Sequence, residues 1–143
     1  MFKQDLEEWQ EIEREFATYL MRKNIVGIEF SQGKFPDRDI KAWFIKDWVV
    51  WWRTFEIKYD KKSDETWNVW FEYMCNWKPS WIYKSKADYL VYKVNWKFYM
   101  AYRPKLLIEL NNCQKMDLPW WDNNMSRLYV VKKDVFKSIF KEI

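Results

Sequence analysis

The sequence predicts an α/β fold, because helical periodicity at the N-terminus gives way to a series of strand-like runs. Residues 3–23 place apolar side chains on one helical arc: Leu6, Trp9, Ile12, Phe16, Tyr19 and Leu20. Strands are predicted at about 25–30, 38–46, 49–59, 67–75, 88–94 and 97–102. Further helices are predicted at about 81–87, from Pro104 to about Cys113 and over 134–143, with a loop at 117–124.

The length and composition predict one globular domain over residues 1–143. Hydrophobic residues make up 49% of the chain and charged residues 32%, a balance typical of globular proteins rather than of disordered chains. No apolar run approaches the roughly 20 residues of a membrane span, and the N-terminus lacks the apolar centre of a signal peptide. We therefore expect a soluble protein in the cytoplasm, with no membrane partner.

The absence of histidine limits the chemistry that this chain can perform. The sequence has no His, and its two cysteines, Cys75 and Cys113, do not form a CxxC pair. Zinc sites of the usual Cys/His type, Ser-His-Asp triads and histidine general bases are thereby excluded. Catalysis would depend on carboxylates, lysines and hydroxyls, and a metal cofactor would be a hard cation such as Mg²⁺ or Mn²⁺. The net charge of +4 is a weak indication of an anionic partner.

Tryptophan is unusually common and glycine unusually rare, with 12 Trp against 2 Gly. Asp47-Trp48, Asn76-Trp77 and Asn95-Trp96 fall between predicted strands, where tight hairpins favour Asp-Gly or Asn-Gly because the second residue needs positive φ. One hypothesis is that these positions are glycine in the natural protein, which would follow if its source reads UGA as Gly. The alternative is a genuinely Trp-rich protein. The coding DNA distinguishes the two, because a TGG codon at any of these positions specifies Trp.

One acidic residue interrupts the apolar arc of the N-terminal helix. Glu13 projects between Leu6, Phe16 and Leu20, where a carboxylate is costly unless another group satisfies it. Either this part of the helix is exposed, or Glu13 belongs to a polar site.

A second polar group is predicted on the third strand, in the segment Phe55–Asp60. Period-two alternation places Glu56 and Lys58 on one face of the sheet. If strands 38–46 and 49–59 pair through the turn at Asp47-Trp48, Asp39 lies beside Glu56. With Glu13, three carboxylates and a lysine would then meet at one end of the sheet, a combination that suits Mg²⁺.

These residues resemble the PD-(D/E)xK nuclease superfamily, which combines a helix Glu, an Asp at the second strand and E-x-K on the third. The segment EREFATYL at 13–20 resembles the first helix of archaeal Holliday-junction resolvases, FPDRDI supplies the Asp and FEIKYD supplies E-x-K. The stretch from ETWNVWFEY to KPSWIYKSKADYLVY resembles phage and bacterial members, which have glycine at the positions of Trp67, Trp77 and Trp81. The similarity covers about residues 10–100.

The resemblance implies a restriction-endonuclease-like fold, in which helices flank a central mixed sheet, and a role for each site residue. Asp39 and Glu56 would be metal ligands with the main-chain carbonyl of Ile57. Lys58 would be the catalytic lysine, and Glu13 a helix carboxylate that orients water or a second metal. Asp37 is the alternative to Asp39.

The expected function is Mg²⁺- or Mn²⁺-dependent hydrolysis of DNA phosphodiester bonds. The alternatives are a dimeric Holliday-junction resolvase and an inactive nucleic-acid-binding module of the same fold. Lys78, Ser80 and Lys86 are candidates for contacts with DNA phosphates, although the lysines could equally be solvated.

Overall fold

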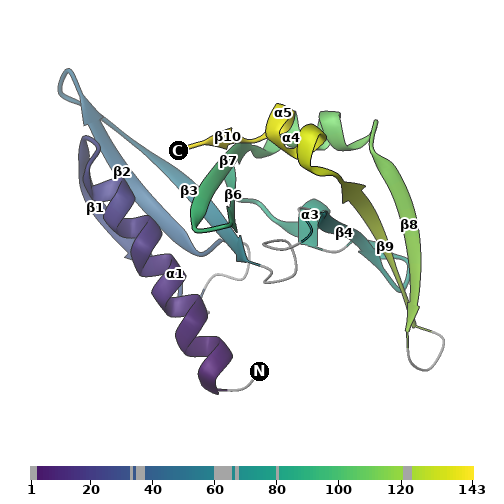
Figure 1. Ribbon diagram of the computed structural model, residues 1–143. Coiled ribbons are helices and arrows are strands. Elements are labelled where there is room, and N and C mark those ends of the chain that lie inside the picture. Colours follow the sequence, from purple (N-terminus) through teal and green to yellow (C-terminus); the bar gives the residue numbers. More distant parts are fainter. Residues whose placement is uncertain are drawn as a thin grey trace.

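The computed structural model describes residues 3–32, 34, 38–59, 66, 68–79, 81–120 and 124–143. It is a mixed α/β structure in which helices pack on β-sheets (Figure 1). Among the described residues, no helix is both long and apolar enough to cross a membrane.

The central sheet is mixed, as predicted. Its strand order is β1 (Ile25–Phe30), β2 (Ile40–Lys46), β3 (Val49–Tyr59), β6 (Tyr89–Val94), β7 (Lys97–Tyr102) and β10 (Lys141–Glu142). The β3 and β6 strands are parallel, whereas the other neighbours are antiparallel. Strands β1, β2, β3, β6 and β7 begin and end within about two residues of their predicted bounds.

A second, antiparallel sheet was not predicted. It has the order β5 (Lys78–Pro79), β4 (Val69–Cys75), β9 (Asn124–Val131) and β8 (Gln114–Trp120). The prediction of a loop at 117–124 is therefore wrong for residues 117–120 and for Asn124. Pro119 indicated a loop, but it lies on β8, which is an edge strand among the described strands of this sheet. An edge strand tolerates a residue without a backbone N–H, because one side of it has no neighbouring strand.

The helices follow the predicted order and are shorter at their ends. They are α1 (Lys3–Met21), α3 (Trp81–Lys84), α4 (Arg103–Leu110) and α5 (Lys133–Ile139). Pro104 lies in the first turn of α4, where the missing N–H costs no helical hydrogen bond. The last predicted helix gives way to β10, which pairs with β7 and returns the chain to the central sheet.

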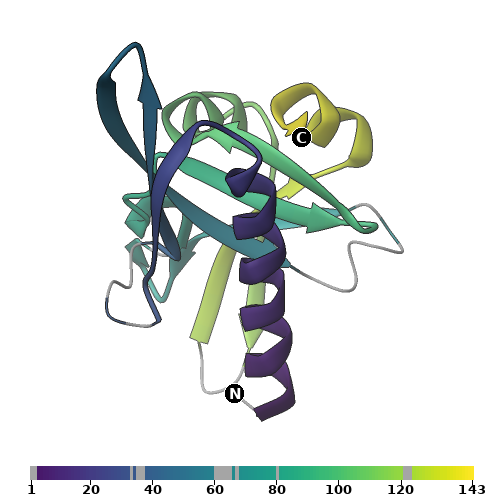
Figure 2. The same cartoon turned by 90° about the vertical axis from the view of Figure 1, so that its left-hand side faces the viewer.

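Helix α1 covers one face of the central sheet, as Figure 2 shows. Its predicted apolar arc buries Ile12, Phe16 and Leu20 against side chains of the sheet, including Phe55 and Ile57. The rings of Phe16 and Phe55 meet edge to face with centroids 5.3 Å apart. Burying each such side chain stabilises the fold by about 1.5–3 kcal/mol, and together these side chains fix α1 across β2 and β3.

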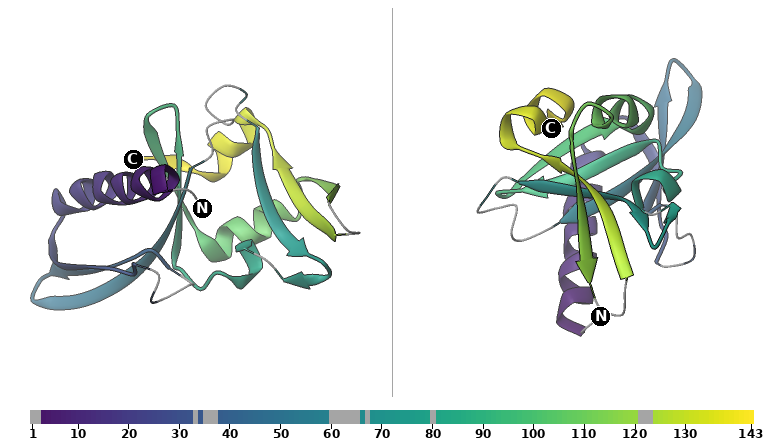
Figure 3. Two further views of the ribbon diagram at one scale, coloured as in Figure 1. Left: turned by 90° about the horizontal axis from the view of Figure 1, so that it is seen from below. Right: turned by 90° about the vertical axis from the view of Figure 1, so that its right-hand side faces the viewer.

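The opposite face of β6 packs against the second sheet and the later helices. Along β6, Leu90, Tyr92 and Val94 contact this second core, whereas Val91 contacts the core beneath α1. Both faces of β6 are therefore buried, and α1 and the second sheet lie on opposite sides of β6 and β7 (Figure 3). A strand buried on both faces explains the nearly continuous apolar run YLVYKV.

The tight hairpin turns adopt the left-handed backbone that the sequence predicted. The first turn residues Asp47, Asn76 and Asn95 have φ of 52°, 51° and 49°, and the Trp after each has φ of 64°, 65° and 67°. Positive φ at both positions defines the type I′ turn, whose second position strongly favours glycine. A residue with a Cβ loses roughly 1–2 kcal/mol in this conformation. The backbone thus supports the hypothesis of glycine at these positions, which the coding DNA decides.

The three turn tryptophans differ in what their rings contact. The guanidinium of Arg127 lies 4.4 Å from the ring centroid of Trp77, and Lys93 Nζ lies 5.2 Å from that of Trp96. Cation–π contacts contribute about 0.5–1 kcal/mol at exposed sites and more where the cation is buried, as Lys93 is, which partly offsets the backbone cost. Trp48 is 94% exposed and therefore gains little from packing.

We expect Trp48→Gly to raise the free energy of unfolding by about 1 kcal/mol, because glycine relieves the positive φ. Trp77→Gly and Trp96→Gly should gain less, since each also loses a cation–π contact. Urea titration followed by circular dichroism measures the difference. Trp70→Gly, in the extended backbone of β4, is the control and should be destabilising. A Trp48→Gly variant no more stable than the parent would contradict this assignment of strain.

Candidate active site

Asp39 is held at the end of the central sheet by two hydrogen bonds to β3. Its backbone N–H donates to the Phe55 carbonyl oxygen at 2.8 Å, and its Oδ2 accepts from the Ile57 N–H at 2.7 Å. The β2–β3 register pairs Ile40 with Phe55, so that the preceding residue, Asp39, lies next to Glu56. The structure therefore brings Asp39 and Glu56 together in the way that hairpin pairing predicted.

Glu56 and Lys58 lie on the same face of β3, as their alternation predicted. Lys58 Nζ is 3.6 Å from Glu56 Oε1, and the Glu56 side chain is only 9% exposed. The Lys58 ammonium also lies 5.9 Å from the centroid of the Trp9 ring on α1. Lys58 thus reaches from the sheet toward α1 while remaining paired with Glu56.

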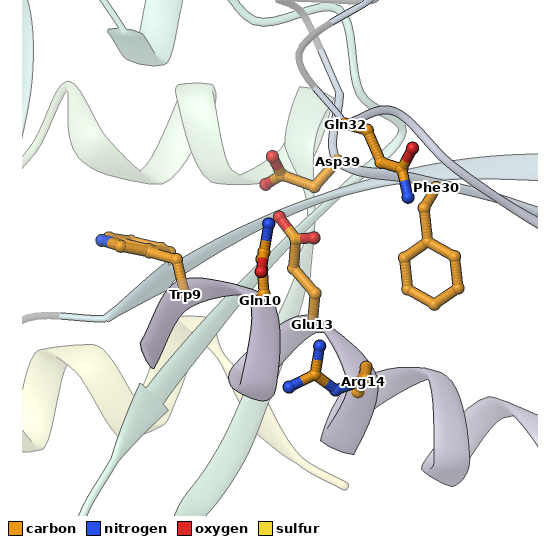
Figure 4. A pocket seen from close by; sticks show the side chains of 7 residues that line it. All are labelled: Trp9, Gln10, Glu13, Arg14, Phe30, Gln32 and Asp39. Carbon is orange, nitrogen blue, oxygen red and sulfur yellow. The ribbon is translucent and has the colours of Figure 1, made fainter. Parts of the chain in front are cut away.

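Glu13 reaches the same end of the sheet from α1. In Figure 4 its carboxylate and that of Asp39 point toward one another across a pocket of about 650 Å³. Glu13 is half-buried rather than fully exposed. Because it lines the same pocket as Asp39, the acid that interrupts the apolar arc borders the predicted site. The other side chains that line the pocket are Trp9, Gln10, Arg14, Phe30 and Gln32.

The electrostatics of these two acids reflect burial and mutual repulsion. Burial, together with the negative charge of Asp39, raises the pKa of Glu13 to about 7, and Arg14 opposes the shift. Burial also raises the pKa of Asp39, although the Ile57 N–H and the positive charge of Lys58 partly counteract it. The folded protein therefore holds two carboxyl groups whose negative charge is costly, which is the condition that an added cation relieves.

The acidic residues do not by themselves form a crowded metal cage. Within the described part of the chain, no three Asp, Glu, Cys or His side chains are grouped closely enough to hold a metal ion. A cation at this place would have Asp39 and Glu56 as its carboxylate ligands, and the remaining positions would fall to main-chain oxygen and water. Such a sparse protein ligand set is typical of Mg²⁺ sites.

The lysines predicted to contact DNA lie on other segments than those that carry these acids. Lys78 is exposed on β5 of the second sheet, and Lys86 is exposed in the segment before β6. Their exposure is compatible with phosphate contacts and with simple solvation. Ser80 and the alternative ligand Asp37 lie outside the described residues, as does Trp67.

Two further acids have structural partners. Asp88 Oδ2 accepts hydrogen bonds from the Thr54 N–H at 2.8 Å and from its hydroxyl at 3.2 Å, which joins β3 to the start of β6. Glu72 Oε2 accepts a hydrogen bond from the Ser126 hydroxyl at 2.9 Å within the second sheet. These hydrogen bonds indicate that Asp88 and Glu72 stabilise the packing of neighbouring strands.

Sequence reasoning missed Gln10 and Arg14 as neighbours of the site. They flank Glu13 on α1, and Gln10 lies one helical turn before it. Helical spacing could have identified Gln10, which is three residues before Glu13, and then Arg14, which is four residues after Gln10, since residues three or four apart share a helix face.

Comparisons with family models, with curated protein sequences and with solved structures found no match to this chain.

The raised pKa of Glu13 predicts that stability falls as pH rises. Because the folded-state pKa is about 7 and the ordinary value is 4.5, the folded protein holds the proton more tightly, and stability is lost between these two pH values. We expect a loss of about 1 kcal/mol after allowing for solvent screening of a half-buried group. The midpoint of urea unfolding, measured from pH 4.5 to 8, should change less with pH in Glu13→Gln than in the parent protein.

Glu7→Gln is the control for this experiment, because Glu7 is exposed on the same helix. It should retain the pH dependence of the parent protein. An equal slope in Glu13→Gln and the parent would show that Glu13 does not carry the effect.

Proposed function

We propose that this protein is a metal-dependent deoxyribonuclease, with Mg²⁺ or Mn²⁺ as its cofactor, that hydrolyses phosphodiester bonds in DNA. The observation that carries the proposal is the meeting of Asp39, Glu56 and Lys58 at one end of the β2–β3 pair, with Glu13 facing Asp39 from α1. An acidic pair with an adjacent lysine is the combination that the PD-(D/E)xK resemblance requires.

The topology around these residues supports a restriction-endonuclease-like fold. Helix α1 is followed by the antiparallel strands β1, β2 and β3, and β6 then returns parallel to β3. The acid of the second strand and the E-x-K segment of the third therefore occupy neighbouring strands in the order that the resemblance implies.

The donor set fits a hard divalent cation. Asp39 and Glu56 supply charged oxygens from adjacent strands, and the resemblance adds the main-chain carbonyl of Ile57. Burial raises the pKa of Asp39, so a nearby cation would stabilise the ionised carboxylate that it needs as a ligand. When bound, Mg²⁺ supplies Lewis-acid polarisation of the phosphoryl oxygen and a lowered pKa for bound water.

The side chains of this chain have distinct roles in the proposed reaction. Lys58 Nζ donates hydrogen bonds that orient the attacking water, and its positive charge offsets the charge that develops on the phosphoryl oxygens. Asp39 and Glu56 hold the ligand geometry, because both are fixed by β3. Glu13, with a pKa of about 7, can exchange a proton with nearby water close to neutral pH.

We expect Lys58→Ala and Asp39→Asn each to lower the rate of DNA cleavage by about 100-fold or more, because each removes a charge at the reacting phosphate. The assay compares linear, single-stranded and four-way DNA with Mg²⁺, Mn²⁺ or EDTA. Lys105→Ala and Asp134→Asn, both exposed on distant helices, are matched controls and should cleave normally. Undiminished cutting by both site variants would remove this assignment. If the parent protein binds DNA without a metal and does not cleave it, the inactive nucleic-acid-binding module is favoured instead.

Metal binding can be measured separately from cleavage. We expect Mg²⁺ to raise the Tm of the parent protein, and to raise it further as the Mg²⁺ concentration increases above its Kd, because it binds the folded state. Asp39→Asn should lose this shift and Lys58→Ala should retain it, since Asp39 is a proposed ligand of the cation and Lys58 is not. Thermal unfolding with Mg²⁺ and with EDTA tests both variants. An equal Mg²⁺ shift in Asp39→Asn would place the cation elsewhere.

A further inference from the structure

The face of the β2–β3 hairpin that carries the candidate active site continues outward as an aromatic and basic surface. The register pairs Trp43 with Trp52 and Lys41 with Thr54, and Ile40 with Phe55. Because side chains alternate, Lys41, Trp43 and Trp52 share the face of Asp39 and Glu56. The hairpin projects from the rest of the molecule beside α1 (Figures 1 and 2).

The two indole rings are gathered around the Lys41 ammonium. Lys41 Nζ lies 4.4 Å from the centroid of the Trp52 ring and 5.0 Å from that of Trp43. The Trp43 ring lies over β1, where a Cβ built on Gly27 would be 3.6 Å from its Cε3 atom. Trp52 remains 50% exposed. The surface therefore combines an anchored ring, an accessible ring and a cation.

The neighbouring charges leave Lys41 directed toward the rings. Glu29 is opposite Lys41 in the β1–β2 register, but its Oε1 pairs with the Arg38 guanidinium at 3.4 Å. Lys41 follows Asp39 by two residues on β2, so its positive charge lies on the same face between Asp39 and the rings. A polyanion that approaches the acids through a bound cation would meet this lysine next.

Trp43 and Trp52 also differ from the turn tryptophans in their backbone. Neither has positive φ, and both lie in paired strands. The conformational reason to expect glycine at Trp48, Trp77 and Trp96 does not apply to them.

We propose that this surface, formed by Lys41, Trp43 and Trp52, binds a single-stranded segment of DNA next to the cleaved phosphate. The inference rests on the proposed nuclease function and specifies its substrate class. From Glu56 to Trp52 the distance along β3 is about 13 Å, comparable with about four stacked nucleotides. Bases of a duplex stack on one another, whereas unpaired bases present faces to the indole rings, and lysine contacts the backbone. The preferred substrate is therefore DNA with a single-stranded tail or flap.

Fluorescence anisotropy of labelled oligonucleotides in EDTA tests binding without cleavage. The parent protein should bind a single-stranded oligonucleotide and a tailed duplex more tightly than a blunt duplex. Trp52→Ala should weaken binding to the first two by about tenfold and change binding to the blunt duplex less than twofold. Trp52→Phe should recover most of the loss, because a phenyl ring still stacks. Trp70→Ala is the matched control, since Trp70 is 45% exposed on the second sheet.

Unchanged single-strand binding by Trp52→Ala, or an equal loss for single-stranded and blunt DNA, would overturn the proposal. A parent protein that self-associates in sizing experiments, with Trp52→Ala monomeric and DNA binding unaffected, would also overturn it, because the surface would then join two copies of the chain. Failure of this inference is distinguishable from failure of the nuclease function. Loss of cutting in Asp39→Asn with normal DNA binding by Trp52→Ala would remove only the single-strand surface.

Discussion

The register of the β2–β3 hairpin is the constraint on which the candidate site depends. A slip of one residue would move every side chain of β3 to the opposite face and separate Glu56 from Asp39. The tight turn at Asp47 and Trp48 sets this register at one end of the hairpin. The hydrogen bond from the Ile57 N–H to Asp39 Oδ2 secures it at the other. The Asp39 side chain therefore fixes the pairing at this end of the hairpin and also supplies a carboxylate to the site.

The position of α1 adds an electrostatic cost to this arrangement. Phe16 and its neighbours anchor the helix on β2 and β3, and the same anchoring directs Glu13 toward Asp39. On the polar side of the helix, Glu15 Oε2 receives a hydrogen bond from Lys93 Nζ at 2.8 Å, which ties α1 to β6. Apolar packing and this ion pair thus hold Glu13 close to Asp39, although the pKa of each is raised. Carboxyl groups with perturbed pKa values are typical of functional sites.

Much of the central sheet could be predicted from local sequence signals. The turn pairs Asp47-Trp48 and Asn95-Trp96 locate the β2–β3 and β6–β7 hairpins, and short-range pairing then follows from alternation. For this reason the proximity of Asp39 to Glu56 and of Glu56 to Lys58 was predictable. The β1 strand and α1 were also predictable, because β1 is rich in β-branched residues and the apolar side chains of α1 recur at helical spacing over most of its length.

The second sheet was less predictable, because its pairing is distant in sequence. Val69 pairs with Val131, and no turn signal connects them. The segment that became β8 contains Asp117 and Pro119, residues that favour loops when they are considered locally. Helical periodicity places Glu15 opposite the apolar arc of α1, and the sequence gives no indication that Lys93 lies within hydrogen-bonding distance of it. Such contacts depend on tertiary packing, which local periodicity does not encode.

The central claim is that Asp39 and Glu56 together hold a divalent cation beside Lys58. Crystals of the protein grown with Mn²⁺ and measured for anomalous scattering test it directly. The expected result is a Mn²⁺ peak within coordination distance of both carboxylates, with Lys58 Nζ nearby. Well-ordered Asp39 and Glu56 side chains with no peak between them, or a peak only at another place in the molecule, would contradict the claim.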